Sequence, residues 1–287
     1  GGKNMGAWGT ALYSNDTASD IRGDYVDLLR RGNSNEEALK KLMEKNRYCI
    51  GDEEEEPLFW YALADTLWNY GRLTPEVKEK ALYFLDHPEA ELARWEDDGG
   101  KYVEAWMRTL EKLRTKLLSP QPPEKKVSKY RLYKCTWQVG DVYAYRLESE
   151  YSKEKGLYGK YIIFQKVGET DCWPGHIIPV IFVYRWIGES LPTKEELACL
   201  PILQQYYPCA LKRYPDTAGS LVALMIGSKK ITPVSQLTFM GNMPINESRF
   251  DSKKICDYFG WEKSRWNVKL EREIINLYFA WQEYDNA

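Results

Sequence analysis

The sequence predicts an α+β protein, with an N-terminal helical bundle followed by a domain in which helices pack on a strongly bent antiparallel sheet or small barrel. Apolar residues first recur at helical spacing, and alternating β-branched and aromatic runs then take over. A proline-rich segment separates the two patterns, and 287 residues suit about two domains. We therefore expect a helical bundle over 5–118, a linker over 119–129 and an α+β domain over 130–287.

The first two helices are predicted from their ends. Asp16 or Thr17 can cap a helix that stops at Gly32, where glycine tolerates the left-handed backbone of a helix terminus. A second helix opens at Ser34, because Glu37 three residues later completes a capping box.

Three further helices follow in the first domain. One covers 58–70, and another begins at Pro75 after the N-cap Thr74 and continues to about residue 85. The last and longest carries an apolar stripe of Tyr102, Trp106, Leu110, Leu113 and Leu117. After it, Pro120, Pro122 and Pro123 favour an extended spacer.

The second domain is predicted to begin with strands. Period-two runs occur at 130–137, 141–147, 160–167, 178–186, 221–226 and 234–239. A capping box at Thr193 and Glu196 opens a short helix to about residue 200, and two more helices are expected at 251–259 and 274–284.

Charge is distributed unevenly along a chain whose formal net charge is −2. Residues 6–118 contain 23 acidic and 16 basic residues, whereas residues 119–287 contain 19 and 23. No run of apolar residues is long enough to span a membrane, and no secretion signal is recognisable, so we expect a cytoplasmic protein with free thiols at its six cysteines.

The sequence offers no recognisable catalytic centre, cofactor site or metal site. Glycine-rich phosphate loops and paired zinc ligands are absent. Cys172 and His176 could bring a thiolate near an imidazole, but we expect an ordinary turn between strands, because a cysteine nucleophile needs a positioned base. The expectation is a protein without enzymatic activity, cofactor or metal.

Two acidic clusters are candidates for binding a basic partner. They comprise Asp52, Glu53, Glu54, Glu55 and Glu56, and Glu96, Asp97 and Asp98. The first also suits a helix start, since acidic side chains stabilise a helix N-terminus. The second could hold a divalent metal, although neighbouring residues on a helix face different directions.

Aromatic residues make up 14% of the chain and suggest a second kind of site. Those of the first domain fall at helical spacing and fit a bundle core or an interface. In the second domain a concave sheet face could stack a ring with Tyr143, Tyr145, Tyr161, Phe164 and Tyr184. Dispersed lysines and arginines argue against nucleic acid as the ligand.

The most specific string is Met5-Gly6-Ala7-Trp8-Gly9-Thr10-Ala11-Leu12-Tyr13-Ser14-Asn15-Asp16-Thr17-Ala18-Ser19-Asp20. It resembles the opening of a bacterial family of uncharacterised proteins, M-G-x-W-G-x-x-x-[FY]-x-N-D-x-A-x-D, and the Trp95-Glu96 and Trp106-Met107-Arg108 segments resemble its later signature. The resemblance covers about 5–118. We expect Trp8, Gly9, Tyr13, Asn15 and Asp16 to determine the fold rather than to catalyse.

A shorter string, Gly140-Asp141-Val142-Tyr143-Ala144 with Gly159-Lys160-Tyr161, resembles immunity-protein domains found beside bacterial polymorphic toxins. That resemblance covers about 130–190 and leaves the end of the chain unexplained. It implies a protein that binds and neutralises a toxin.

Together these observations favour a non-catalytic bacterial interaction protein, an immunity protein whose acidic clusters meet a basic toxin domain. The alternative is a small-ligand or nucleic-acid binder, or an atypical enzyme, that uses the aromatic sheet face.

Overall fold

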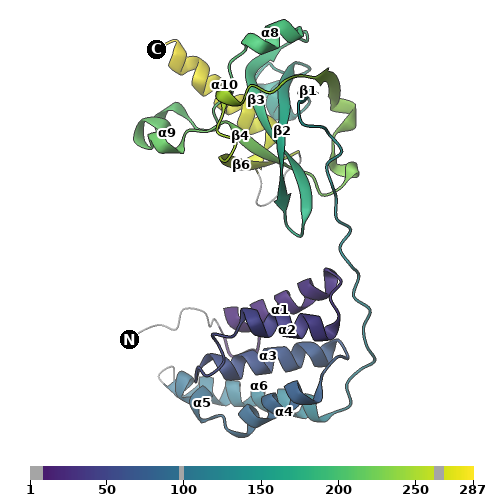
Figure 1. The fold of residues 1–287 in the computed structure, drawn as a ribbon. Coiled ribbons are helices and arrows are strands. Elements are labelled where there is room, and N and C mark those ends of the chain that lie inside the picture. The colour runs from purple at the N-terminus through teal and green to yellow at the C-terminus, as the bar shows by residue number, and fades with distance from the viewer. Residues whose placement is uncertain (1–8, 97–99, 262–267) are drawn as a thin grey trace. The chain divides into compact units, whose positions relative to one another are not determined.

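The computed structural model describes residues 9–96, 100–261 and 268–287, and the chain divides into two compact units, Gly1–Tyr130 and Arg131–Ala287. Each unit is described by itself (Figure 1). The α+β class is confirmed, since helices and a mixed sheet both occur.

The described elements of the first unit, the helical unit, are all helices. They are α1 (Asp16–Arg30), α2 (Asn35–Lys45), α3 (Glu55–Asn69), α4 (Pro75–Asp86), α5 (Glu89–Glu96) and α6 (Gly100–Leu118). The capping box at Ser34 and the N-cap at Thr74 are confirmed, whereas the N-cap of α1 is Asn15 rather than the predicted Asp16 or Thr17. Helix α3 begins three residues earlier than predicted.

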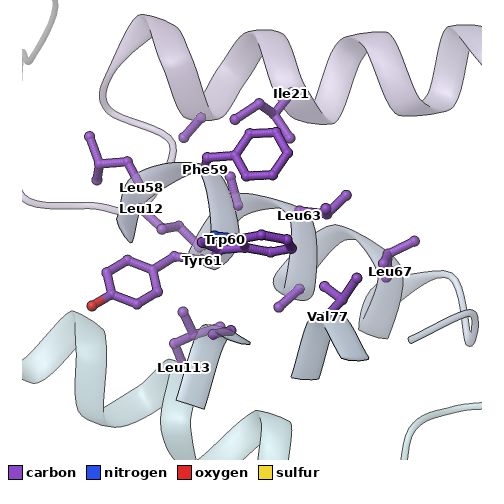
Figure 2. Packing of buried hydrophobic residues seen from close by; sticks show 14 of the residues in the cluster. Leu12, Ile21, Leu58, Phe59, Trp60, Tyr61, Leu63, Leu67, Val77 and Leu113 are labelled. Atoms are coloured by element: carbon purple, nitrogen blue, oxygen red, sulfur yellow. The ribbon is translucent and has the colours of Figure 1, made fainter. Parts of the chain in front are cut away.

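The core of the helical unit is built around α3. Residues Pro57 to Leu67 of this helix are all buried, and α1, α4 and α6 each pack against it. Figure 2 shows Ile21 of α1 above Phe59, and Leu113 of α6 on the opposite side of α3. Because this stretch is buried all round, apolar residues occupy most of its positions and its amphipathic period is weak.

The proline-rich segment expected to act as a spacer lies along the helical unit. The Lys125 backbone N–H donates to the Tyr70 carbonyl at 2.9 Å, and Tyr130 donates its own N–H to the carbonyl of Arg30 at 2.9 Å. Gly71 has φ of +67°, and a Cβ there would collide with the Pro122 carbonyl. Glycine is therefore required both to end α3 and to admit this segment.

The second unit is built on one sheet, with strand order β5-β1-β2-β3-β4-β6-β7. The strands are β1 (Asp141–Arg146), β2 (Tyr161–Cys172), β3 (His176–Gly188), β4 (Leu221–Met225), β5 (Leu237–Asn242), β6 (Ile255–Gly260) and β7 (Val268–Lys269). Pairing is antiparallel from β5 to β4 and parallel from β4 to β7. Over the described strands the sheet stays open, so the predicted barrel is not formed and the predicted antiparallel pairing holds for only part of it.

Helices and loops cover both faces of this sheet. The apolar side of α10 (Leu270–Asp285) packs with Ile162 and Phe164 on one face. On the other face Leu197 of α8 (Lys194–Cys199) packs with Phe182. Two short helices, α7 (Glu150–Glu154) and α9 (Pro208–Arg213), complete the described α-helices of the unit.

Three predictions for the second unit differ from the structure. Residues 130–137 form no strand, and only Lys134 bridges to Ile177. The predicted strand at 234–239 starts with a 3-10 turn over Val234–Gln236. The predicted helix at 251–259 is a turn followed by β6, because parallel pairing with β4 supplies its backbone partners.

Candidate protein-interaction surface

The acidic run at 52–56 helps to begin α3. The Asp52 carboxylate accepts hydrogen bonds from the backbone N–H groups of Glu54 and Glu55, both at 2.9 Å. Glu55 in turn accepts from the Thr17 hydroxyl at 2.7 Å, which joins the start of α3 to α1. Asp52 and Glu55 therefore both stabilise the start of α3, as the helix-start interpretation expects.

Glu56 connects the same run to an aromatic residue. Its carboxylate accepts from the Gly51 N–H at 2.6 Å and from the Trp60 indole N–H at 3.0 Å. Asp52, Glu53 and Glu54 are exposed. Some carboxylate oxygens of the run thus accept hydrogen bonds at the start of α3, while the run still presents negative charge at the surface.

Two exposed apolar residues lie directly before these carboxylates. In the connection between α2 and α3, Tyr48 is 70% exposed and Ile50 is 41% exposed, whereas Cys49 between them is buried. We call Tyr48, Ile50, Asp52, Glu53 and Glu54 the turn surface. Apolar residues rimmed by charge are typical of protein interfaces, and aromatic side chains often provide much of the binding energy there.

Sequence reasoning missed Tyr48 and Ile50. One local signal could have found them, because both lie after Met43, the last apolar residue of α2, and before the apolar run of α3. Their exposure, however, depends on how α2 and α3 are placed, which the sequence pattern does not give.

The second acidic cluster is only partly described. Helix α5 ends at Glu96, and Asp97 and Asp98 lie outside the described residues.

The four tyrosines proposed as a ligand face do not share a face of the sheet. Tyr143 lies opposite Phe164 in the β1–β2 pair, and both belong with Tyr145 to the cluster under α10. Tyr161 and Tyr184 belong to the cluster on the opposite face. A single stacking platform is therefore not formed by these side chains.

Two of these tyrosines are also committed to internal hydrogen bonds. The buried Tyr145 hydroxyl donates to a Glu271 carboxylate oxygen at 2.8 Å, and the buried Tyr184 hydroxyl donates to the Gln165 side-chain oxygen at 3.1 Å. Burial raises the pKa of both residues, and the Glu271 charge adds to the effect on Tyr145. These rings support the core of the unit.

The packing of Tyr143, which is half-buried, can be tested by titration. Its ring packs 4.5 Å from Trp137 and 5.4 Å from Phe239 between centroids, and burial, followed by the Asp141 charge, raises its pKa from 10.0 to about 12. Because the folded-state pKa is raised, the stability linked to it is complete below about pH 10 and is lost as the pH rises toward 12. Tyr143→Phe should remove, from an absorbance titration, one tyrosine that ionises near pH 12. Loss of one that ionises near pH 10 would show that the ring is exposed.

The opening motif has structural contacts. The Asn15 side chain accepts from the Ala18 N–H at 2.7 Å and donates to the Leu12 carbonyl at 3.0 Å. Asp16 lies in the first turn of α1, where its charge is favourable. A Cβ on Gly9 would press on the Ser14 side chain. Trp8 lies outside the described residues.

Tyr13, the remaining motif residue, belongs to a polar network in the helical unit. Its hydroxyl donates to Asp65 at 2.7 Å. Asp65 also accepts from the Lys116 ammonium at 2.6 Å and from the Asn69 amide at 2.8 Å. Burial and the Asp65 charge raise the pKa of Tyr13, which keeps its hydroxyl a donor. These contacts agree with a fold-determining role for the motif.

Cys172 and His176 flank the turn between β2 and β3, as the turn interpretation expects. The His176 Nδ1 accepts from the Tyr133 backbone N–H at 2.8 Å, whereas the Cys172 sulfur lies 3.5 Å from the Met225 sulfur. Burial raises the pKa of the Cys172 thiol, which disfavours the reactive thiolate. Within the described ranges no group of three or more His, Cys, Asp and Glu side chains is placed to hold a metal.

Comparison with protein families, with curated proteins and with solved structures finds no match for this chain. Of the helices in the described part of the chain, none has the length and apolar character needed to cross a bilayer.

Proposed function

We propose that this chain is a cytoplasmic, non-catalytic bacterial interaction protein that binds a basic protein domain through the turn surface. The observation that supports the proposal is the juxtaposition of exposed Tyr48 and Ile50 with the carboxylates of 52–54. The partner we propose is a toxin domain, so that the chain acts as its immunity protein. The short resemblance at 140–161 motivates this choice of partner.

In the proposed mechanism, charged residues speed association and apolar residues slow dissociation. A toxin that cleaves nucleic acid presents a basic surface to phosphates, so an acidic partner is drawn to that surface by long-range attraction. The helical unit suits this role because acidic residues outnumber basic ones over 6–118 by 23 to 16. Tyr48 and Ile50 then exclude water from the contact and slow dissociation.

Growth rescue tests the proposed function. Each protein encoded by the genes that flank this one is expressed in a bacterial host, alone and together with the chain, and binding is measured by calorimetry. We expect one flanking product to arrest growth, to be neutralised by the chain and to bind it. If none is both toxic and bound, the immunity proposal is wrong.

Substitutions in the turn surface locate the contact. Tyr48→Ser should weaken binding of the neutralised toxin by about tenfold or more, because a truncated aromatic hot spot costs over about 1.4 kcal/mol. Tyr158→Ser, at a tyrosine of the second unit that is 54% exposed, is the matched control and should leave the affinity unchanged. Equal weakening by the two variants would contradict the placement of the site.

A charge reversal tests the steering step separately. Glu53→Lys should slow association and reduce its dependence on salt, with little change in the dissociation rate, because rim charges act mainly on encounter. The control is Glu111→Lys, at an exposed position of α6. If the two reversals slow association to the same extent, net charge alone rather than the turn surface steers the partner.

A further inference from the structure

The helical unit contains an apolar cleft, apart from the turn surface, that its own helices leave open. Helix α2 packs mainly on α1, while α4 packs on α3 and α6, and a cleft of about 380 Å³ lies where α2 faces α3 and α4. Leu39 and Met43 of α2, both half-buried, form the accessible apolar wall, and the buried side chains of Trp60, Leu63 and Val77 close the cleft beneath them. Figure 2 shows Trp60, Leu63 and Val77 on their two neighbouring helices.

The charges around this cleft have one sign. Of the described residues that line it, the two charged ones are both glutamates, Glu36 of α2 and Glu76 of α4, and both are exposed. They lie on opposite walls. A ligand seated between them would therefore be favoured by positive charge on both of its sides.

The length of the cleft fits a helix. Its lining on α2 extends from Asn35 to Met43, which at 1.5 Å per residue is about 12 Å, or roughly two helical turns. An amphipathic helix places apolar side chains at i, i+3 or i+4, and i+7 on one face, and polar residues beside them. The partly exposed Leu39 and Met43, with Glu36 and Glu76 beside them, complement that pattern when the flanking residues are Lys or Arg.

We propose that this cleft binds a basic amphipathic helix of a partner protein. The helix packs its apolar face against Leu39 and Met43, and its Lys or Arg side chains reach Glu36 and Glu76. This inference does not depend on whether the partner of the turn surface is a toxin.

The test uses the full chain and a synthetic peptide of leucine and lysine, about 14 residues long, patterned as a four-turn amphipathic helix. Calorimetry gives its affinity, and methyl NMR gives its location. We expect shifts of the Leu39, Met43, Leu63 and Val77 methyl groups on titration. Shifts confined to other methyl groups would overturn the proposal, as would shifts of the cleft methyls on dilution of the chain alone, which would make a second copy the occupant.

A pair of charge-reversal variants separates the cleft from net charge. Glu36→Lys with Glu76→Lys should weaken binding of the leucine–lysine peptide by about tenfold or more and favour its leucine–glutamate counterpart. The control combines Glu104→Lys with Glu111→Lys, which changes the net charge equally at exposed positions of α6. Circular dichroism checks that both variants are folded. If both pairs weaken binding equally, the peptide is held by overall charge and the cleft is not its site.

Discussion

Replacing Asp65 with alanine is expected to lower the free energy of unfolding of the helical unit by about 3 kcal/mol. The substitution removes the acceptor of three hydrogen bonds, from Tyr13, Asn69 and Lys116. This loss of stability is at the lower end of the range for a broken buried ion pair, because the Lys116 side chain is 27% exposed and stays partly hydrated. Urea unfolding, with hydrogen exchange at the α3 amides to assign the transition, measures the change.

Asp24→Ala is the matched control for this prediction. Asp24 also forms an ion pair with a lysine, but the Lys45 side chain is 63% exposed. Removal of such a surface pair should cost less than about 1 kcal/mol. Similar losses from the two variants would mean that the Asp65 network does not hold the opening motif onto the helices.

Glu271→Ala is expected to destabilise the second unit by a similar amount, about 3 kcal/mol. This buried carboxylate in the first turn of α10 accepts from the Tyr145 hydroxyl at 2.8 Å and from the backbone N–H groups of Glu148 and Ser149 at 3.2 and 3.0 Å. Alanine leaves all three donors without this acceptor, so the connection after β1 loses its attachment to α10. Thermal unfolding of the variant checks the prediction.

Glu273→Ala, two residues further along α10, provides the control. Its carboxylate accepts one exposed hydrogen bond from the Tyr207 hydroxyl at 3.1 Å. We expect a loss below about 1 kcal/mol, since water replaces that donor. If Glu271→Ala destabilises the second unit no more than this control does, the Tyr145 hydroxyl is not a structural hydrogen-bond donor. Tyr145 would then again be a candidate ligand-binding residue.

Local signals predicted the helix starts well. The capping boxes at Ser34 and Thr193 and the proline after Thr74 form within a few residues, so the sequence contains all of their partners. The prediction of a helix at 251–259 was wrong for the opposite reason. Ile255, Tyr258 and Phe259 suit a helical stripe as well as a strand, and only parallel pairing with β4, far away in the sequence, decides between them.

The candidate sites show the same division between local and tertiary information. Strand alternation already separates Tyr161 from Phe164, because an odd spacing places them on opposite faces. Asp65 also left a signal, since it is the only charged residue between Pro57 and Gly71. The position of Tyr48 between two apolar runs is a local signal, but its exposure follows from the placement of α2 and α3.

A basic partner that docks on the turn surface of the helical unit should protect the backbone of that surface from exchange. Hydrogen–deuterium exchange of the full chain, with and without the toxin that it neutralises, measures this protection. We expect slower exchange at the amides of 46–54 in the complex, with the sheet of the second unit unchanged. Slower exchange confined to the second unit, with 46–54 unaffected, would mean that the partner does not dock on the turn surface.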